Sequence, residues 1–205
     1  MWGWGVMNQV AIQEAANIRY PMENFIGVWW SGSENDVLPV GAKSNGYKAL
    51  AFHNVGSDFP IFDDIQKFVV DRGKAAGAGD QIGTVLYNRG MYNALLLTEA
   101  AKTAQAITGK SAISQADMIK GMEASEITEE KMTALGLPGF GPSFKVSCQN
   151  HGGDGMVGVA QWDANAGKWS LISNYQQSDM SVLQPLIDAD SGAFASENNL
   201  SPNCN

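Results

Sequence analysis

Cys148, His151 and Asp154 lie together in one short glycine-rich stretch of the chain. A cysteine beside a histidine is the pair that an enzyme uses as nucleophile and general base. The members of such pairs are usually distant in sequence, and the chain has no nucleophile-elbow motif. A disulfide at Cys148 would also remove the thiol. We therefore expect a protein that is not an enzyme.

Cys148 and Cys204 are the only cysteines of the chain. They form no C-x-x-C pair and lie near no usable group of histidines, so we expect neither a metal site nor a cofactor. A bridge between them would hold the C-terminal tail to the body of the protein in an oxidising compartment. Their spacing is equally compatible with two unrelated thiols. The tail from Ser191 is polar, and we expect it to be mobile without this tether.

Two further groups of side chains are suited to binding. Trp29, Trp30 and Ser31 follow one apolar run, and His53 follows the next. A tryptophan offers a flat, rigid wall, and a histidine can donate a hydrogen bond to a carboxylate. Paired tryptophans also fill cores and interfaces, and a lone histidine is often a satisfied structural residue. Both interpretations remain open at this stage.

Tyr87 and Arg89 lie where the chain enters its longest predicted helix, over residues 86–107. An amide-rich helix start with an arginine can hold an anion. Arg89 can equally pair with a neighbouring acid.

The elements that position these side chains alternate between helix and strand. Apolar spacing predicts a helix over 6–18 and a short one over 34–40, and apolar runs predict strands over 25–30 and 47–53, the first of them buried on both faces. This alternation is typical of a parallel α/β fold, in which ligands bind at the carboxyl ends of the strands.

Further along, the pattern predicts three more helices and then β structure. A helix is expected over 59–71, a second is capped by Ser114, and a third runs from Thr128 to Gly136. The later runs are expected to be short strands, with a hairpin from 161–163 to 168–169.

Composition excludes several classes of partner. The chain has 205 residues, 44% of them hydrophobic, which is enough for a globular core. A net charge of -8 without a basic stripe argues against binding to nucleic acid. No apolar run is long enough for direct membrane insertion. Residues 1–6 have neither the basic nor the leucine-rich part of a secretory signal, so no signal peptide is expected in this chain.

Four segments in order resemble one known family. They are FIGVWWSGSE at 25–34, GYKA at 46–49, YNRG at 87–90 and GVAQWD at 158–163. Together they resemble the substrate-binding proteins of ABC transporters of the leucine/isoleucine/valine class. The resemblance implies a type I periplasmic binding protein, with two Rossmann-like lobes joined by three crossings and a small-molecule solute held between them. It also implies a periplasmic location and a membrane permease as partner.

By this resemblance the chain is the C-terminal half of such a protein. Residues 1–56 would be part of the C-terminal lobe, 57–135 the C-terminal helices of the N-terminal lobe, and 136–205 the return to the C-terminal lobe with a hairpin and a tail. The alternative is the ligand-sensing domain of an amide or amino-acid receptor or regulator, which shares the fold.

The resemblance also bears on the ligand. Tyr92 resembles a helix tyrosine that lines the hinge of the family. Amino-acid binders of the family hold the ammonium group with an acidic side chain after the first strand, where this chain has Trp29 and Trp30, with Glu34 a few residues on. We expect a ligand among the branched-chain amino acids or related small organic acids and amides, with an aromatic or apolar acid or amide favoured.

Overall fold

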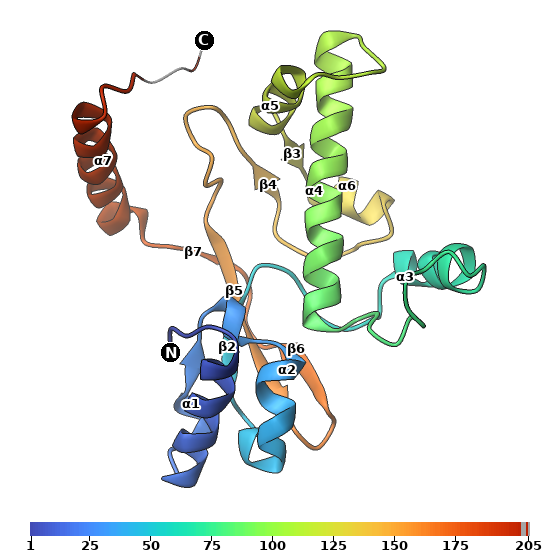
Figure 1. Ribbon diagram of the computed structural model, residues 1–205, viewed down its shortest axis with the longest axis vertical. Helices are drawn as coiled ribbons and strands as arrows, with labels where there is room; N and C mark the ends of the chain where they lie inside the picture. The colour runs from blue at the N-terminus through green and yellow to red at the C-terminus, as the bar shows by residue number, and fades with distance from the viewer. Residues whose placement is uncertain (202–203, 205) are drawn as a thin grey trace.

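The computed structural model describes residues 1–201 and 204. Two groups of elements lie one above the other, connected by extended segments, and a last helix stands to one side (Figure 1). We call them the lower group, which contains the N-terminus, and the upper group, which contains the longest helix.

The lower group is a mixed sheet with helices against it. Its helices and strands are α1 (Val6–Asn17), β1 (Ile26–Gly27), α2 (Glu34–Val37), β2 (Lys48–Ala51), β5 (Met156–Asp163), β6 (Lys168–Leu171) and β7 (Gln176–Gln177), with 3-10 turns over Met22–Asn24, Trp29–Ser31 and Leu38–Ser44. The sheet order is β1-β2-β5-β6, and β7 pairs with β5. β1 and β2 are parallel, whereas β5 is antiparallel to both β2 and β6.

The predicted hairpin is confirmed. Asp163 pairs with Lys168 at its turn, and Trp162 lies opposite Trp169 one step inward. Both tryptophans are buried in the core of the lower group, where the Trp169 ring also contacts Tyr47. The hairpin therefore contributes two large aromatic side chains to the core of the lower group.

The first predicted strand is shorter and more exposed than expected. The structure has a strand only at Ile26 and Gly27, and the Ile26 side chain is 41% exposed, so the run is not buried on both faces. The reason lies just beyond it, because the backbone N–H and the hydroxyl of Ser31 both donate to the carbonyl of Val28. These bonds close a 3-10 turn, which takes Trp29 and Trp30 out of the sheet.

The upper group is mainly helical. Its elements are α3 (Pro60–Ile65), a π-helical turn (Gln66–Val70), α4 (Val85–Thr108), α5 (Gln115–Glu123), β3 (Glu126–Ile127), α6 (Glu129–Ala134) and β4 (Phe144–Lys145). Its core is formed by Phe59, Phe62, Ile127, Met132, Leu137 and Phe140. The predicted caps at Ser114 and Thr128 are confirmed, because their side chains cap α5 and α6; Gly109 ends α4 in the left-handed conformation. The helix predicted over 34–40 is α-helical only over Glu34–Val37, and the one predicted over 59–71 is divided into α3 and the π-helical turn.

Helices α4 and α5 pack closely through small residues. A Cβ at Gly121 of α5 would lie 2.2 Å from the carbonyl oxygen of Ala100 and 2.7 Å from the Cβ of Ala104, both on α4. Only a glycine allows the two backbones to approach this far. The alanine-rich sequence of α4 predicts such close packing, and the structure confirms it.

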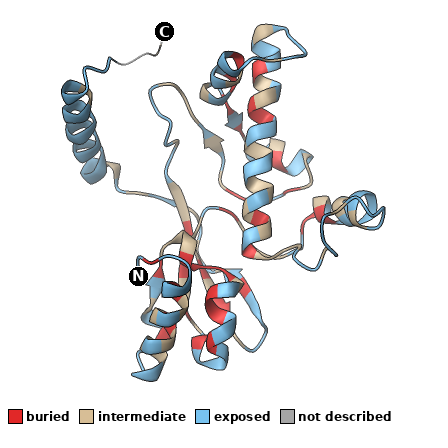
Figure 2. Cartoon of the chain, viewed as in Figure 1, coloured by how far each residue is buried: buried red, intermediate tan, exposed pale blue. Residues whose placement is uncertain are grey.

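Helix α7 (Met180–Glu197) was not predicted. The polar stretch from Ser191 supplies its last turns, and the carboxylate of Asp179 caps its start by accepting the N–H of Ser181. None of its residues is buried, and Figure 2 shows it exposed along its whole length. Within residues 1–201 and 204, no helix combines the length and the apolar character that crossing a membrane would require.

Candidate functional site

Three segments of the chain meet between the lower and upper groups, around the carbonyl of Phe140. The backbone N–H of Asn54, just after β2, donates to this oxygen at 2.5 Å. The hydroxyl of Tyr175, just before β7, donates to the same oxygen at 3.5 Å. Figure 1 shows the extended segments that connect the two groups. A side chain in this region lies close to both the lower and the upper group.

Trp29 and Arg89 connect the lower group to α4. The guanidinium of Arg89 donates from Nη2 to the carbonyl oxygen of Trp29 at 2.7 Å and lies 5.0 Å from the centre of a Trp29 ring. A cation over an indole face is attracted by the negative face of the ring. The ring of Phe52, beyond the end of β2, lies 5.4 Å from Trp29. The carboxyl ends of β1 and β2 therefore carry one aromatic and cationic cluster.

Trp30 extends this cluster toward the N-terminus. Its ring lies 4.9 Å from that of Trp29, and it stacks on Trp4 with centroids 4.3 Å apart and planes 12° from parallel. Trp2 contacts its edge at 5.3 Å. The indole N–H of Trp30 is buried and has no hydrogen-bond partner among the described residues. Trp2 and Trp4 were not among the predicted site residues, although their alternation with glycine already placed two indoles near each other.

His53 is buried beside Phe140 and Tyr92. It is 3% exposed, its Nδ1 lies 2.9 Å from the carbonyl oxygen of Asn54, and its ring stacks on Phe140 at 5.7 Å. Burial lowers the pKa of the imidazole to about 4. His53 is therefore neutral at pH 7. Its one N–H lies on Nδ1, facing the Asn54 carbonyl oxygen, so Nε2 can accept a hydrogen bond but the ring supplies no positive charge. Burial also raises the pKa of the Tyr92 hydroxyl, so that group remains a neutral phenol.

Asn88 fixes the segment that follows His53. Its side chain is fully buried, and its amide nitrogen donates to the carbonyl of Gly56 at 2.9 Å and to that of Asn54 at 3.3 Å. Its Oδ1 has no partner among the described residues. Asn88 was not a predicted ligand residue, although it lies between two that were. Its contacts make it a positioning residue for the segment between β2 and α3.

Glu34, which belongs to the lower group, contacts the start of α4 at the same junction. Its carboxylate accepts the N–H of Val85, the first residue of α4, at 3.2 Å. A negative charge at a helix N-terminus is favourable. Burial is the main cause that raises the pKa of Glu34, and burial likewise lowers the pKa of Arg89. Glu34 is thus held against the base of α4.

The structure brings together some predicted site residues and separates others. Trp29, Trp30 and Arg89 form one cluster, and His53 and Tyr92 form a second one around Phe140, in which the rings lie 6.1 Å apart. Ser31 and Tyr87 belong to neither.

Those two side chains have structural contacts of their own. Ser31 is fully buried, with its hydroxyl bound to Val28 and its carbonyl oxygen accepting the Tyr47 hydroxyl at 3.0 Å. Tyr87 packs edge-on against Phe62 in the upper core.

A groove lies between the connecting segment after β2 and the hairpin. It has a volume of about 810 Å³ and is lined by residues 54–56 of the connecting segment and by 168–174 of the hairpin. Its lining does not include Trp29 or Trp30. The two tryptophans are therefore not walls of this groove.

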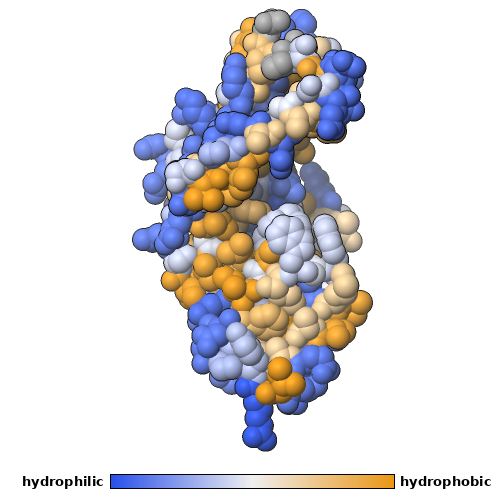
Figure 3. Space-filling view, turned by 90° about the vertical axis from the view of Figure 1, so that its left-hand side faces the viewer, coloured by the Kyte–Doolittle hydropathy of each residue, from blue (hydrophilic) through white to orange (hydrophobic). Residues whose placement is uncertain are grey.

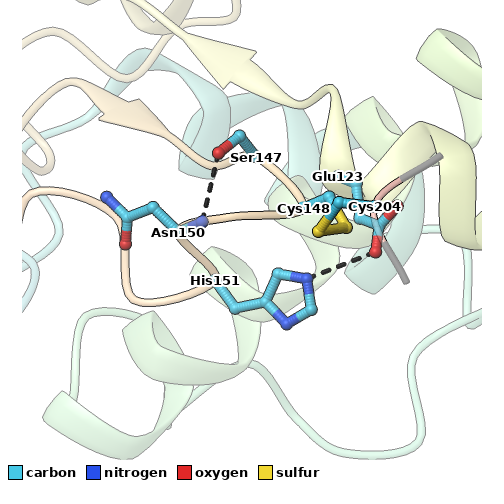
Figure 4. The surroundings of a disulfide bond; sticks show 6 residues. All are labelled: Glu123, Ser147, Cys148, Asn150, His151 and Cys204. Atoms are coloured by element: carbon cyan, nitrogen blue, oxygen red, sulfur yellow. Dashed lines mark hydrogen bonds and ion pairs between the residues drawn. A yellow bond between two sulfur atoms is a disulfide. The ribbon is translucent and has the colours of Figure 1, made fainter. Parts of the chain in front are cut away.

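In the structure Cys148, the cysteine that an enzyme would need as its nucleophile, is part of a disulfide. Cys148 is bonded to Cys204, with their Cα atoms 5.4 Å apart (Figure 4). Nε2 of His151 lies 3.3 Å from a carboxylate oxygen of Glu123, the last residue of α5. Ligand atoms of Glu123, Cys148 and His151 lie within 4.8 Å of one another. Because the Cys148 sulfur is bonded to Cys204, it is neither the thiolate that a nucleophile requires nor one that binds a metal.

Comparison with known proteins identifies the fold. No family model matches the chain, and comparison with curated proteins gives no match. A crystal structure described as an ABC transporter permease from the Pseudomonas fluorescens group is 37% identical, with a TM-score of 0.89 over 98% of this chain and 49% of that one.

Two further solved structures share the fold at lower identity. A branched-chain amino acid ABC transporter protein from Thermus thermophilus with bound valine is 16% identical, with a TM-score of 0.59 over 84% of this chain and 44% of that one. A substrate-binding protein of an ABC transporter from Aeropyrum pernix is 14% identical, with a TM-score of 0.60 over 87% and 44%. The chain therefore has the α/β fold of type I periplasmic binding proteins and spans about half the length of the proteins it matches.

Proposed function

We propose that this chain supplies one half of a solute-binding protein that works outside the cytoplasm with the permease of an ABC importer. The observation that carries the proposal is the match to the Pseudomonas structure, with a TM-score of 0.89 over 98% of this chain but only 49% of that one. The Thermus structure, which contains valine, supports a small solute as ligand. The disulfide at Cys148 supports an oxidising compartment such as the periplasm.

In this proposal the lower and upper groups belong to two different lobes. Residues 1–56 and the hairpin would be part of the C-terminal lobe, and residues 57–135 the last helices of the N-terminal lobe. Each group has its own core of buried residues, which supports two lobes, with Val85 at the start of α4 in the lower core and Leu137 and Phe140 in the upper one. The junction around Phe140 would then be part of the hinge, and the solute would bind at the lobe boundary.

The proposed ligand is a small organic acid or amide with an apolar or aromatic body. Trp29 and Trp30 offer a large, rigid contact surface with little loss of side-chain entropy on binding. Arg89 supplies the positive charge for a carboxylate, since His53 is neutral at pH 7. The chain has no acidic side chain directly after β1 to hold the ammonium group of an amino acid, and the carboxylate of Glu34 is engaged by Val85.

Calorimetric titration of the full two-lobe protein tests both the ligand class and the site. The titrants are leucine, a benzoate-type acid and a short amide. We expect the acid or the amide to bind more tightly than leucine, and Trp29→Ala and Trp30→Ala each to weaken that binding about tenfold or more. Phe68→Ala is the matched control, because Phe68 is an exposed aromatic residue of the π-helical turn away from the junction. Tightest binding of leucine, unchanged in either tryptophan variant, would refute both assignments.

A further inference from the structure

Four side chains that can bind a metal ion meet at the disulfide. Ligand atoms of Glu123, Cys148 and His151 lie within 4.8 Å of one another, and the sulfur of Cys204 is bonded to that of Cys148 (Figure 4). These residues come from the end of α5, the loop after β4 and the segment after α7. Cysteine spacing alone predicted no metal site, because the carboxylate and the second sulfur reach the loop only through the fold.

The separations in this cluster fit a tetrahedral zinc ion. Nε2 of His151 lies 3.3 Å from a carboxylate oxygen of Glu123. Zinc binds nitrogen and oxygen at about 2.0–2.1 Å, so two such ligands of a tetrahedral ion lie about 3.4 Å apart. A sulfur at about 2.3 Å from the ion lies about 3.6 Å from the imidazole nitrogen. Since the whole cluster already lies within 4.8 Å, side-chain shifts of about 1 Å close it around an ion.

A tight turn carries both Cys148 and His151. The backbone N–H of Ser147 donates to the carbonyl of Asn150 at 3.0 Å, and the N–H of Asn150 donates to the Ser147 hydroxyl at 3.1 Å. Two residues separate the cysteine from the histidine, which is the short ligand spacing of many structural zinc sites. The His151 side chain is 69% exposed, so an ion in solution reaches it. Hydrophilic side chains are spread over the upper part of the molecule on the side of α7 (Figure 3).

We propose that the dithiol form of this chain binds one zinc ion through Cys148, Cys204, His151 and Glu123. The dithiol is present before the bridge forms, and a phosphine reductant restores it. The phosphine gives two electrons to the S–S bond and becomes a phosphine oxide with the oxygen of a water molecule, whose two protons complete the thiols. Zinc then displaces one proton from each thiol. Two thiolates and an imidazole favour zinc over magnesium and calcium, which prefer oxygen ligands.

Zinc and the disulfide are then alternative ways of holding the same segment. Either one ties the residues after α7 to the loop after β4, and each uses the sulfurs that the other requires. Bound zinc should therefore slow oxidation of the two cysteines, and the bridge should exclude the ion. The net charge of -8 and Asp154 in the same loop favour the approach of a cation. This inference goes beyond the proposed function and does not depend on which solute is bound.

The experiment titrates Co²⁺ and then Zn²⁺ into the 205-residue chain after phosphine reduction. Co²⁺ occupies tetrahedral zinc sites and adds a charge-transfer absorption for bound thiolates. We expect one Co²⁺ per chain with that absorption, and its displacement by one equivalent of Zn²⁺. Glu123→Gln and His151→Gln should each weaken binding at least about tenfold, since loss of even an outer-shell partner costs about that much. Glu126→Gln is the matched control, because this exposed carboxylate pairs with Lys145 and lies outside the cluster.

Three results would overturn the proposal. The first is a reduced chain that binds no Co²⁺. The second is binding of equal strength with the disulfide intact, because the sulfurs would then not be ligands. The third is unchanged binding in both Glu123→Gln and His151→Gln. Cys204→Ser leaves Cys148 as a thiol without any reductant and should bind more weakly than the reduced chain; equal binding would contradict the four-ligand site. Circular dichroism checks that each variant is folded, and no titration contains a solute, so failure of the proposed function would leave these results unchanged.

Discussion

The buried imidazole of His53 makes the stability of the chain depend on pH. In an unfolded chain the imidazole takes up a proton as the pH falls below its ordinary pKa of 6.5, whereas in the fold burial holds the pKa at about 4. The unfolded state therefore binds more protons between these two values. The contribution of His53 to the free energy of unfolding has its full value above pH 6.5 and falls as the pH drops toward 4.

The size of this effect follows from the two pKa values. Their difference corresponds to about 3 kcal/mol in total, of which about 2 kcal/mol is lost between pH 7 and about pH 4.5. That is a large part of the stability of an ordinary domain. Carboxylates with a lowered pKa, such as Asp117 beside the Ser114 backbone N–H and Lys110, add a loss of the same sign. The contribution of His53 is therefore measured as a difference between variants.

The assay is urea unfolding, followed by tryptophan fluorescence, at pH 7 and at about pH 4.5. His53→Gln should have a lower stability at pH 7 because its ring contacts are lost, but should lose about 2 kcal/mol less than the unmodified chain on acidification. His151→Gln is the matched control, because the chain has only these two histidines and the side chain of His151 is 69% exposed. Equal acid losses in the His53→Gln variant and the unmodified chain would refute the reasoning.

Three further outcomes test other parts of the structure. Thiol titration under denaturing, non-reducing conditions should find no free thiol, because Cys148 and Cys204 are bridged; two free thiols would contradict this. Replacing both by serine should lower the free energy of unfolding by up to about 4 kcal/mol in the chain-entropy estimate, as urea midpoints would show. Gly121→Ala should cost about 1–3 kcal/mol, because its Cβ has no room against Ala100, and an unchanged midpoint would mean that α5 can move away. The chain alone should bind an apolar fluorescent dye at its exposed apolar surfaces, and the complementary half should suppress that signal; absence of dye binding would contradict exposure of those surfaces.

The elements that the sequence predicted well are those with local signals. The caps at Ser114 and Thr128 and the glycine at 109 are each decided by a few neighbouring residues, so those helix ends were predictable. The first strand was predicted too long, because apolar composition alone does not reveal that Ser31 closes a turn onto Val28. Helix α7 was not predicted, and none of its residues is buried among the described residues.

The candidate site was predictable in part and for similar reasons. The carboxyl ends of parallel strands meet, so Trp29 and His53 could be expected at one edge of the sheet. The contact of Arg89 with Trp29 joins residues far apart in the sequence, and the burial that makes His53 neutral depends on Phe140, which arrives from a third segment. Contacts of this kind are set by the tertiary fold and have no local signature.

The anchoring of α4 at one end gives this helix a mechanical role. Glu34 holds the N–H of Val85 and Arg89 holds the carbonyl of Trp29, so the first turns of α4 are fixed to the lower group. The helix has 24 residues and is therefore about 36 Å long. A tilt of about 10° at its base would displace its far end by about 6 Å by simple lever geometry over that length. If α4 tilts as a rigid body about these two hydrogen bonds, a sub-ångström shift of its first turn at Trp29 becomes a several times larger displacement where α4 contacts α5.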